Sequence, residues 1–523
     1  MSRTDPAQLE LAHDQDCNPS SNPHLRDILQ ARLTRRQALL GSASLASVSV
    51  LAGLGLVGCK DGSNSDSNTG AATSAPKLGF TAVPKSTADA VSVPPGYNVS
   101  VLYALGDPID NATAAWTDNG SETGVSYEKR AGDHHDGMYY FGLNAAGQLD
   151  RNASDRGVLC INHEALNAFS NSTGSNALYI HANGATVAGG VRTVPDEVVK
   201  EINSHGVSVI EVRKNAAGQF EVMKGSALNR RVTAATEMDL TGPVRGADFV
   251  KTKFSTDGTR TRGTVNNCAN GYTPWGTYLT CEENYEGYFA RAAGDAAKRT
   301  AKENTSLSRN GKAENTRGRF LWDTAGASDD FKRWDTSVLE GQPADGTGDF
   351  RNVVNTFGWI VEVDVINPSA RPKKRTALGR FAHEGAWPAK FTPGKPVVFY
   401  MGDDNRNDYI YKFVSAQNFN PADTGLTAGD KYLDSGKLYV AKFNADGFGL
   451  WLELTFGQNG LDGTNATYPF ASQADVLVNA RLAADKLGAT KMDRPEWAAV
   501  HPVTGEVYFT LTNNRVASRP IAS

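Results

Sequence analysis

The sequence predicts an all-β chain, folded as a β-propeller around a central metal site. Short runs rich in Val, Tyr, Phe and Thr alternate with turns along most of the 523 residues, and 52 glycines favour many short strands over long helices. The phrase at 381–412, FAHEGAWPAKFTPGKPVVFYMGDDNRNDYIYK, is echoed at 496–514 by EWAAVHPVTGEVYFTLTNN. In both, an acidic residue precedes a bend and a strand, and oxygen-bearing side chains end the strand. Such strand ends can face one centre only if the strands surround an axis, which favours a propeller over two stacked β-sandwiches.

The N-terminal residues are typical of an export signal. Arg35 and Arg36 precede a small-residue, weakly apolar run over 38–58, the form of a twin-arginine signal rather than a membrane anchor. Cys59 closes a lipobox-like phrase and would be lipidated. Residues 60–90, rich in Ser, Asn, Gly and Thr at their start, read as a flexible tether, so we expect domains at 1–59, 60–90 and 91–523.

That signal predicts an exported protein, periplasmic or held at the outer membrane or cell surface by its lipid. Its partner would be the twin-arginine export machinery, and it would touch a membrane only through the lipid. The formal net charge of −4 gives no reason to expect nucleic acid as a partner. We expect a monomer.

The first half of the exported chain should begin with an opening strand at 91–105. A helix is predicted at 195–204, where Pro195 stands in the first turn and acidic residues beside it complement the helix dipole. A hairpin should turn at 215–218. The other strands expected in this half are 139–141, 157–160 and 278–280.

In the second half, residues 290–351 change to Lys, Arg, Ala, Gly and Asp with little alternation, so we expect an inserted, part-helical excursion. Lys373–Arg375 reads as a solvated hairpin tip. A hairpin should turn at 444–447, in the phrase NADG. The other strands expected are 358–365, 397–401 and 507–511.

If the signal is removed, three cysteines remain in an oxidising compartment. Cys268 and Cys281 flank a hairpin and could form a disulfide if the register brings them opposite each other. Cys160 is then the odd cysteine, and it is either buried and inert or bound to something.

Acidic and soft ligands gather at the predicted strand ends. So many carboxylates near one axis would repel one another unless cations compensate them, although any one of them could lie on a solvated loop. Hard oxygen ligands suit Ca²⁺, whereas a thiolate calls for a transition metal, so the site should be mixed. The candidates are Cys160, Glu164, Glu282, Glu283, Glu384, Asp403, Asp404 and Glu496, joined by Asp136, Asp493 and Asn513.

Several long phrases carry a family resemblance. LCINHE, NCANGYTPWGTYLTCEEN, GRFAHEGAW, YMGDDNRNDYIYKFVS and DRPEWAAVHP, with the signal phrase DILQARLTRRQ, resemble the PhoX-type alkaline phosphatases of bacteria, over 27–514. The resemblance implies a propeller exported by the twin-arginine route, with two Fe(III) ions and several Ca²⁺ ions around an oxo bridge. It implies cleavage of small phosphate monoesters.

By phrase, the family's bridging iron-binding cysteine falls on Cys160. Its metal-binding glutamates fall on Glu164, on Glu282 or Glu283, and on Glu384. The resemblance places calcium on Asp403, Asp404, Asp493 or Glu496.

Two positions depart from the family's pattern. His134 stands where members tend to have Asn, and Ala382 stands where they tend to have Lys or Arg. Both positions could help to hold the substrate phosphate, so we expect kept metals and an altered grip on the substrate. The stop at Ser523 also comes before a C-terminal segment usual in the family.

Metal-assisted phosphoryl transfer needs no Ser or His nucleophile, and the sequence has no Gly-x-Ser-x-Gly phrase. We expect His135 and His383 to take part in catalysis, and His134 and Asp136 to hold the phosphate. His163 also stands beside an expected ligand.

Two other functions remain open at this point. A non-catalytic propeller could use calcium to stiffen its channel and bind a partner. A lactonase or phosphotriesterase propeller could use calcium alone and would contain no iron.

Overall fold

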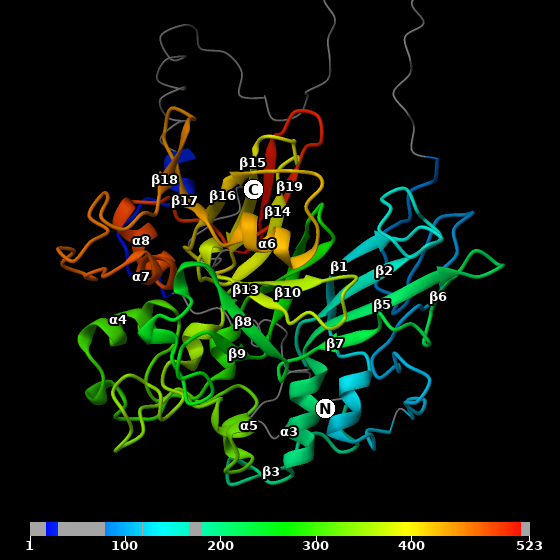
Figure 1. Cartoon of the computed structure of the whole chain (residues 1–523), viewed down its shortest axis with the longest axis horizontal. Helices are drawn as coiled ribbons and strands as arrows, with labels where there is room; N and C mark the ends of the chain where they lie inside the picture. The colour runs from blue at the N-terminus through cyan, green and yellow to red at the C-terminus, as the bar shows by residue number, and fades with distance from the viewer. Residues whose placement is uncertain (1–16, 30–78, 118, 167–179, 514–523) are drawn as a thin grey trace, which may run out of the picture.

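The computed structural model describes residues 17–29, 79–117, 119–166 and 180–513, and they form mostly sheet with some helices (Figure 1). Three larger sheets of five, six and five strands contain most of the strands, and two pairs of strands stand apart from them. Within the described residues these sheets do not close into a barrel or a complete propeller.

The first sheet takes its strands from the N-terminal half of the described chain. Its order is β1-β2-β5-β6, and β7 also pairs with β5. Alternation along β1 and β2 buries one apolar face, which includes Phe141 and Val158. The strands are β1 (His135–Gly142), β2 (Arg156–His163), β5 (Gly206–Lys214), β6 (Phe220–Val222) and β7 (Arg230–Val232).

The second sheet joins segments that are far apart in the sequence. Its order is β10-β11-β12-β13-β8-β9, and β13 pairs with β8 in parallel while the other neighbours are antiparallel. Its strands are β8 (Glu237–Thr241), β9 (Arg260–Arg262), β10 (Asn267–Tyr272), β11 (Thr277–Glu282), β12 (Ile360–Asp364) and β13 (Lys373–Arg375).

The third sheet is an antiparallel meander of consecutive strands, β14 to β18. Residues of β15, β16 and β17 belong to the apolar core that also contains Leu477 and Leu482 of the C-terminal helices. The strands are β14 (His383–Pro388), β15 (Pro396–Asp403), β16 (Ile410–Asn418), β17 (Gly436–Phe443) and β18 (Gly449–Glu453). The separate pairs are β19 (Pro495–Val500) with β20 (Val507–Leu511), and β3 (Val187–Ala188) with β4 (Val191–Arg192).

The helices are short and lie beside the sheets (Figure 1). The α-helices within residues 180–513 are α3 (Pro195–Ser204), α4 (Ala301–Arg309), α5 (Asp329–Lys332), α6 (Gly425–Leu433), α7 (Gln473–Val478) and α8 (Ala480–Leu487). The 3₁₀ helices are η1 (Gly124–Lys129), η2 (Gly242–Val244), η3 (Asp248–Val250), η4 (Tyr285–Tyr288), η5 (Ala296–Lys298), η6 (Trp322–Thr324), η7 (Val353–Thr356) and η8 (Thr376–Leu378).

Most of the expected elements are confirmed. Helix α3 has the predicted bounds, β20 has the predicted bounds, and the hairpins β5-β6 and β17-β18 turn where their Asn–Gly phrases stand. Residues 290–351 contain α4 and α5, as expected for a part-helical excursion. Their aromatic side chains, among them Trp322 and Trp334, pack in one buried cluster.

Two expectations are wrong. Residues 91–105 form no strand, and Val91 and Val101 are 76% and 82% exposed, because their β-branched side chains have no sheet to pack against. The basic phrase at 373–375 is no solvated tip. It is β13, inside the second sheet, where the side chains of Lys374 and Arg375 are fully buried beside Glu282 and Glu362.

Residues 17–29 pack against the body, although the sequence suggested only a signal there. Asn18 is buried, residues 25–29 are helical, and His24 pairs with Lys491 in an isolated bridge. In Figure 1 this dark blue segment lies beside α8 and the β17-β18 hairpin.

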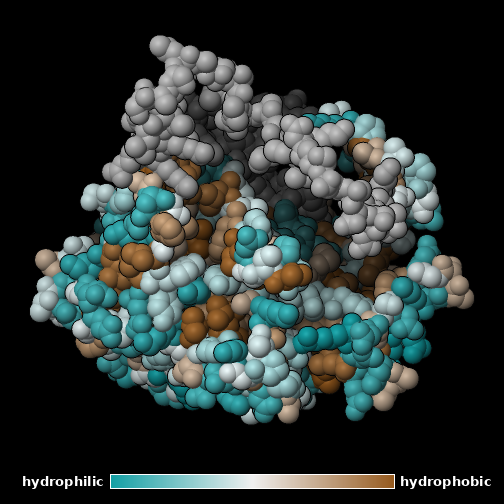
Figure 2. Space-filling view, turned by 90° about the horizontal axis from the view of Figure 1, so that it is seen from above, coloured by the Kyte–Doolittle hydropathy of each residue, from teal (hydrophilic) through white to brown (hydrophobic). Residues whose placement is uncertain are grey.

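One face of the molecule is shown in Figure 2, where hydrophilic residues predominate and apolar residues form separate patches. The exposed apolar residues of the described chain include Phe448, Leu450 and Trp451 around β18. Among the described residues, no helix combines the length and the apolar character that crossing a membrane requires.

Candidate metal centre

The ends of strands from all three larger sheets meet at one place. Asp136 lies near the start of β1 and Glu164 directly follows β2, while Cys268 lies near the start of β10 and Glu283 directly follows β11. The third sheet adds Glu384 of β14 and Asp404, which follows β15. Antiparallel pairing places the start of one strand beside the end of the next, so the two residues from each sheet lie at the same end of their strands.

These side chains form two adjoining groups. In the first group, one ligand atom each from Asp136, Glu164 and Cys268 lies within 4.8 Å of the others. The second group joins Glu283, Glu384 and Asp404 by the same distance, and all three are buried. We call the two groups together the carboxylate cluster.

The sulfur of Cys268 links the two groups. Its Sγ lies 2.9 Å from Oδ2 of Asp136 and 3.1 Å from Oε1 of Glu384. A thiol has only one proton to donate, so it cannot satisfy two ionised carboxylates at once. A cation between these three side chains would relieve that contact.

Asn266 forms a second link between the groups. Its Nδ2 donates to Oε1 of Glu164 at 3.0 Å and to Oε2 of Glu283 at 2.9 Å. The backbone of Asn266 is left-handed, with φ 47°, and its carbonyl accepts from the N–H of Glu283 at 3.0 Å. Asn tolerates this conformation better than most residues, which explains its presence at the entry to β10.

The cluster carries an excess of negative charge in a buried place. Burial and the neighbouring Asp404 raise the pKa of Glu283 and of Glu384 well above the usual range. Burial and the surrounding carboxylates also raise the pKa of the Cys268 thiol, and burial with nearby Asp136 raises the pKa of Glu164. Each shift shows that the ionised form lacks compensation, and bound cations would supply it.

Two arginines border the cluster. Nη2 of Arg494 donates to Oδ2 of Asp404 at 2.6 Å, while Oδ1 of Asp404 is buried and has no hydrogen-bond partner in the part of the chain that the structure describes. Arg319 donates from Nη1 to Oδ1 of Asn266 at 3.1 Å and lies over the ring of Tyr288. Glu496 lies 3.6 Å from Arg494, and burial with nearby Asp404 raises its pKa.

Cys160 is not part of the cluster, so its expected role as the metal-bridging cysteine is wrong. It lies in an apolar core with Val158, Val207 and Val209, and burial there raises the pKa of its thiol to about 12. Strand alternation decides this, since Cys160 shares the inner face of β2 with Val158. The cysteine among carboxylates is Cys268.

The possible disulfide between Cys268 and Cys281 is not formed, and both thiols are free. The register of β10 and β11 shifts between the pairs Asn267–Glu282 and Asn270–Thr280. Cys268 faces the carboxylate cluster, whereas Cys281 packs in the apolar core.

Two other expected ligands are held in buried ion pairs. Glu282 lies 2.7 Å from Nζ of Lys374 and accepts from the N–H groups of Gly358 and Trp359. Asp403 lies 2.5 Å from Nη2 of Arg481. Each of these two carboxylates therefore has a cationic partner of its own outside the carboxylate cluster.

Asp493 is occupied in a different way. Its carboxylate lies 2.8 Å from Nε2 of His24, in the N-terminal segment. Asp493, an expected calcium ligand, thus precedes Arg494 in the sequence, but its side chain contacts the N-terminal segment.

The histidines differ in position. His383 is buried, stacks on Phe381 and directs Nε2 to the carbonyl of Gly379 at 2.8 Å, and burial lowers its pKa to about 3. His135 stacks on Tyr103 and directs Nε2 to the carbonyl of Gly132. The structure thus turns both expected catalytic histidines to backbone carbonyls rather than to the cluster.

His134 and Ala382 mark the two departures from the family's pattern. The side chain of His134 is 40% exposed beside Asp133, which raises its pKa, and Glu164 adds to that effect. Its backbone is left-handed, with φ 43°. Ala382 is buried, and its N–H donates to Asp403.

His163 fills a structural position, with Nε2 lying 2.7 Å from Oγ of Ser208.

Sequence reasoning missed Asn266, Arg319 and Arg494 as residues of the site. Arg494 could have been found, since it stands in the resemblance phrase DRPEW, whereas Arg319 reaches the cluster from the excursion and carries no local signal. The expected signal residues Arg35, Arg36 and Cys59 lie outside the described residues.

The fold and the carboxylate cluster define a metal-binding protein whose centre is assembled from strand ends of several sheets. Comparison with known proteins identifies its family: the family model "Alkaline phosphatase PhoX" matches residues 78–523. The chain belongs to this PhoX family of alkaline phosphatases.

A solved structure supports the same assignment. The chain is 38% identical to Pseudomonas fluorescens PhoX, in a structure described as a complex with vanadate, a transition state analogue. The match covers 84% of this chain and 68% of that one, with a TM-score of 0.70. A search of curated proteins found no match. The protein is a phosphomonoesterase of a metal-dependent family, which argues against the two alternative functions.

Proposed function

We propose that the carboxylate cluster is the catalytic metal centre of this phosphatase, holding Fe(III) at Cys268 and its neighbours and Ca²⁺ at the remaining carboxylates. The observation that carries the proposal is the sulfur of Cys268 within 3.1 Å of both Asp136 and Glu384. A thiol among buried carboxylates suits a transition metal, and oxygen-only positions suit calcium. The residues that would hold the ions are Asp136, Glu164, Cys268, Glu283, Glu384, Asp404 and Glu496.

Bound cations would supply positive charge to the phosphate oxygens and lower the pKa of an attacking water. Asn266 would orient Glu164 and Glu283 through its two hydrogen bonds, as residues behind metal ligands commonly do. Arg494 would hold Asp404 in place.

The chain's own cations would grip the substrate phosphate. Because Ala382 offers no charge, we assign this task to Arg319 and Arg494, with His134 at the more exposed side. Arg319 borders the cluster through its hydrogen bond to Asn266, and its Nε has no hydrogen-bond partner among the described residues. The expected role of Asp136 at the phosphate changes accordingly to one at the metal.

The decisive experiment compares two cysteine variants. Cys268→Ser should lose iron and lower kcat/KM for a chromogenic phosphate monoester by about 100-fold or more. Cys160→Ser is the matched control, since that thiol lies in an apolar core, and it should keep its iron and activity. Metal content by mass spectrometry and the visible absorption spectrum measure both.

Equal iron and activity in Cys268→Ser and the unmodified protein would contradict the proposed centre. Removal of metal by a chelator should abolish hydrolysis, and iron with calcium should restore it. Restoration by calcium alone would contradict the mixed centre.

We also propose a propeller-like arrangement in which the three larger sheets act as blades around this centre. The convergence of their strand ends supports it.

From the sequence, we propose twin-arginine export, lipidation at Cys59 and a monomeric protein in the periplasm or at the cell surface. Metabolic labelling with a fatty-acid analogue tests the lipid, since a protein without label at Cys59 would be soluble.

A further inference from the structure

Residues 17–29, which we call the lead segment, are bound to the body by a set of specific contacts. The side chain of Asn18 donates to the carbonyl of Asn407 at 2.7 Å and to the hydroxyl of Tyr409 at 2.9 Å. Nε2 of His24 lies 2.8 Å from Asp493. Such a set of buried polar contacts is unlike the loose packing of an unattached terminus.

Backbone and apolar contacts extend the same interface. The N–H of Leu25 donates to the carbonyl of Lys491 at 2.9 Å, and the N–H of Lys491 donates to the carbonyl of Pro23 at 3.1 Å. The side chain of Leu25 packs with Ile410, Ala441 and Met492.

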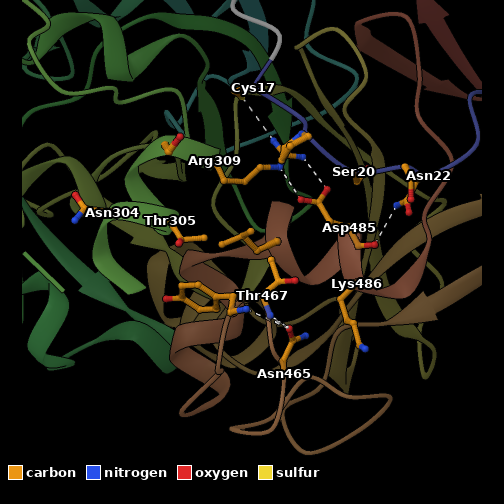
Figure 3. A pocket seen from close by; sticks show the side chains of 15 residues that line it. Cys17, Ser20, Asn22, Asn304, Thr305, Arg309, Asn465, Thr467, Asp485 and Lys486 are labelled. Atoms are coloured by element: carbon orange, nitrogen blue, oxygen red, sulfur yellow. Dashed lines mark hydrogen bonds and ion pairs between the residues drawn. The ribbon is translucent and has the colours of Figure 1, made fainter. Parts of the chain in front are cut away.

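Cys17 lies at the start of the lead segment, above two buried arginines. Arg309 Nη1 and Arg481 Nη1 lie 3.6 and 3.8 Å from its sulfur. Figure 3 shows Cys17, Ser20 and Asn22 at a cavity of about 650 Å³, where Cys17 contacts Arg309 of α4 and Asn22 donates to the carbonyl of Asp485 of α8. The lead segment is thus one wall of this cavity.

The surface that receives the lead segment includes two loops that also reach the carboxylate cluster. In residues 403–408, Asp404 belongs to the cluster and Asn407 accepts from Asn18. In residues 491–494, Asp493 binds His24 and the adjacent Arg494 binds Asp404. The N–H of Asn407 donates to the carbonyl of Met492 at 2.9 Å, so the two loops are themselves joined.

We propose that the lead segment is an intramolecular latch that docks only on the folded loops 403–408 and 491–494, so that its docking is coupled to metal occupancy of the carboxylate cluster. Coupling between two sites is reciprocal, and both sites here bias the same pair of loops. The latch precedes the expected twin-arginine pair at Arg35 and Arg36 in the sequence. Its docked state would therefore mark a precursor whose metal centre is already folded. The docking step stands on its own, and the coupling step rests on the proposed metal centre.

Alkylation of Cys17 in the full-length precursor tests the docking. The precursor is kept in the cytoplasm with Arg35→Lys and Arg36→Lys, and labelling by iodoacetamide is followed by peptide mass spectrometry. Burial raises the pKa of the Cys17 thiol to about 11. Because the Cys17 side chain is only partly exposed and lies against Arg309 and Arg481, we expect labelling slower than in the denatured chain by about tenfold or more.

The double variant Asn18→Ala with Leu25→Asp should restore fast labelling of Cys17. Ser21→Ala is the matched control, because Ser21 is exposed within the same segment, and it should remain protected. Labelling of Cys160, buried in its apolar core, reports global unfolding in each sample. Fast labelling of Cys17 in the otherwise unmodified precursor while Cys160 stays protected would overturn the docking.

Metal removal tests the coupling by the same measurement. After chelation, confirmed by metal analysis, Cys17 should label at least about tenfold faster while Cys160 remains protected, a difference set by the coupling free energy. An unchanged rate at Cys17 in metal-free protein would overturn the coupling and leave the docking intact. If Cys160 also becomes reactive, chelation is repeated at lower temperature until it is protected.

Discussion

Glu282 and Glu283 are neighbours in the sequence but serve different partners. Glu283 joins the carboxylate cluster, whereas Glu282 faces the opposite side of β11 and pairs with Lys374. Both residues were predicted as ligands, because the alternation of a strand places neighbouring side chains on opposite faces but does not indicate which face lines the site. The partner that decides the matter, Lys374, comes from a phrase that looked like a solvated tip.

Lys374→Met should destabilise the protein by about 3–5 kcal/mol, because it leaves the buried carboxylate of Glu282 without its cation. Both side chains are fully buried, with 2.7 Å between them. Urea unfolding measures the change. The double variant Lys374→Met with Glu282→Gln should recover part of the loss, and equal stability of the single variant and the unmodified protein would show that the pair is not maintained.

The cysteines show what could not be read residue by residue. Cys160 stands in the phrase LCINHE, next to an expected ligand, and this proximity made it the candidate. Cys160 points into an apolar core because it lies on the apolar face of β2. Cys268 faces the carboxylate cluster at a point where the register of β10 is irregular. A bulge of this kind changes which side chain faces the site, and the sequence alone does not mark it.

Strands and turns with clear local signals were predicted well. The hairpin β17-β18 has the turn phrase NADG, and helix α3 has Pro195 and acidic residues at its start. Residues 91–105 failed as a strand because their β-branched composition matches a strand whether or not a partner strand exists. Local composition therefore indicates which residues could form a strand, but it does not indicate whether a partner strand is present.

The entry of β10 should control the cluster through Asn266. Asn266→Gly keeps a residue that tolerates φ 47° but removes the side-chain hydrogen bonds, including those to Glu164 and Glu283, and it should reduce metal retention by about 10–100-fold. Asn266→Ala removes the same bonds and adds backbone strain, so it should also lower the thermal midpoint. Metal titration and thermal unfolding separate the two effects.

If Asn266→Gly retained metal as well as the unmodified protein, the bridge from Asn266 to Glu164 and Glu283 would have no role in the centre. A matched control is Asn270→Ala. Asn270 is buried in β10, which Asn266 precedes, and its Nδ2 has no hydrogen-bond partner among the described residues.

At the scale of the whole molecule, buried neutral histidines make the fold sensitive to acid. Burial lowers the pKa of His205 to about 4. Its Nδ1 faces the carbonyl of Glu201 and its Nε2 faces the hydroxyl of Tyr288. Between pH 6.5 and about 4 the unfolded chain binds a proton that the folded chain does not, so stability falls as the pH is lowered through this window.

Lowering the pH from 7.5 to 5.5 should cost about 1 kcal/mol through His205 alone. In His205→Gln, this share of the pH dependence should vanish, whatever the baseline stability of the variant. Urea unfolding of both proteins at the two pH values gives the difference. An identical pH dependence in both would show that His205 is not held neutral.

The radial arrangement of strand ends was inferred from one internal echo and is supported by the convergence at the cluster. The described sheets do not close into a full propeller. A repeat in the sequence predicts the repeated units, but it does not predict how these units would close into a ring.

The carboxylate cluster has a further consequence for how the protein is made. The residues proposed to hold its ions are spread from Asp136 in β1 to Glu496 in β19, and the lead segment contacts residues just before β19. A nascent chain on the ribosome therefore lacks a complete centre until almost the last strand has emerged. Metal insertion into the proposed centre should therefore be a late step in biogenesis, after the acidic edges of the earlier sheets have formed.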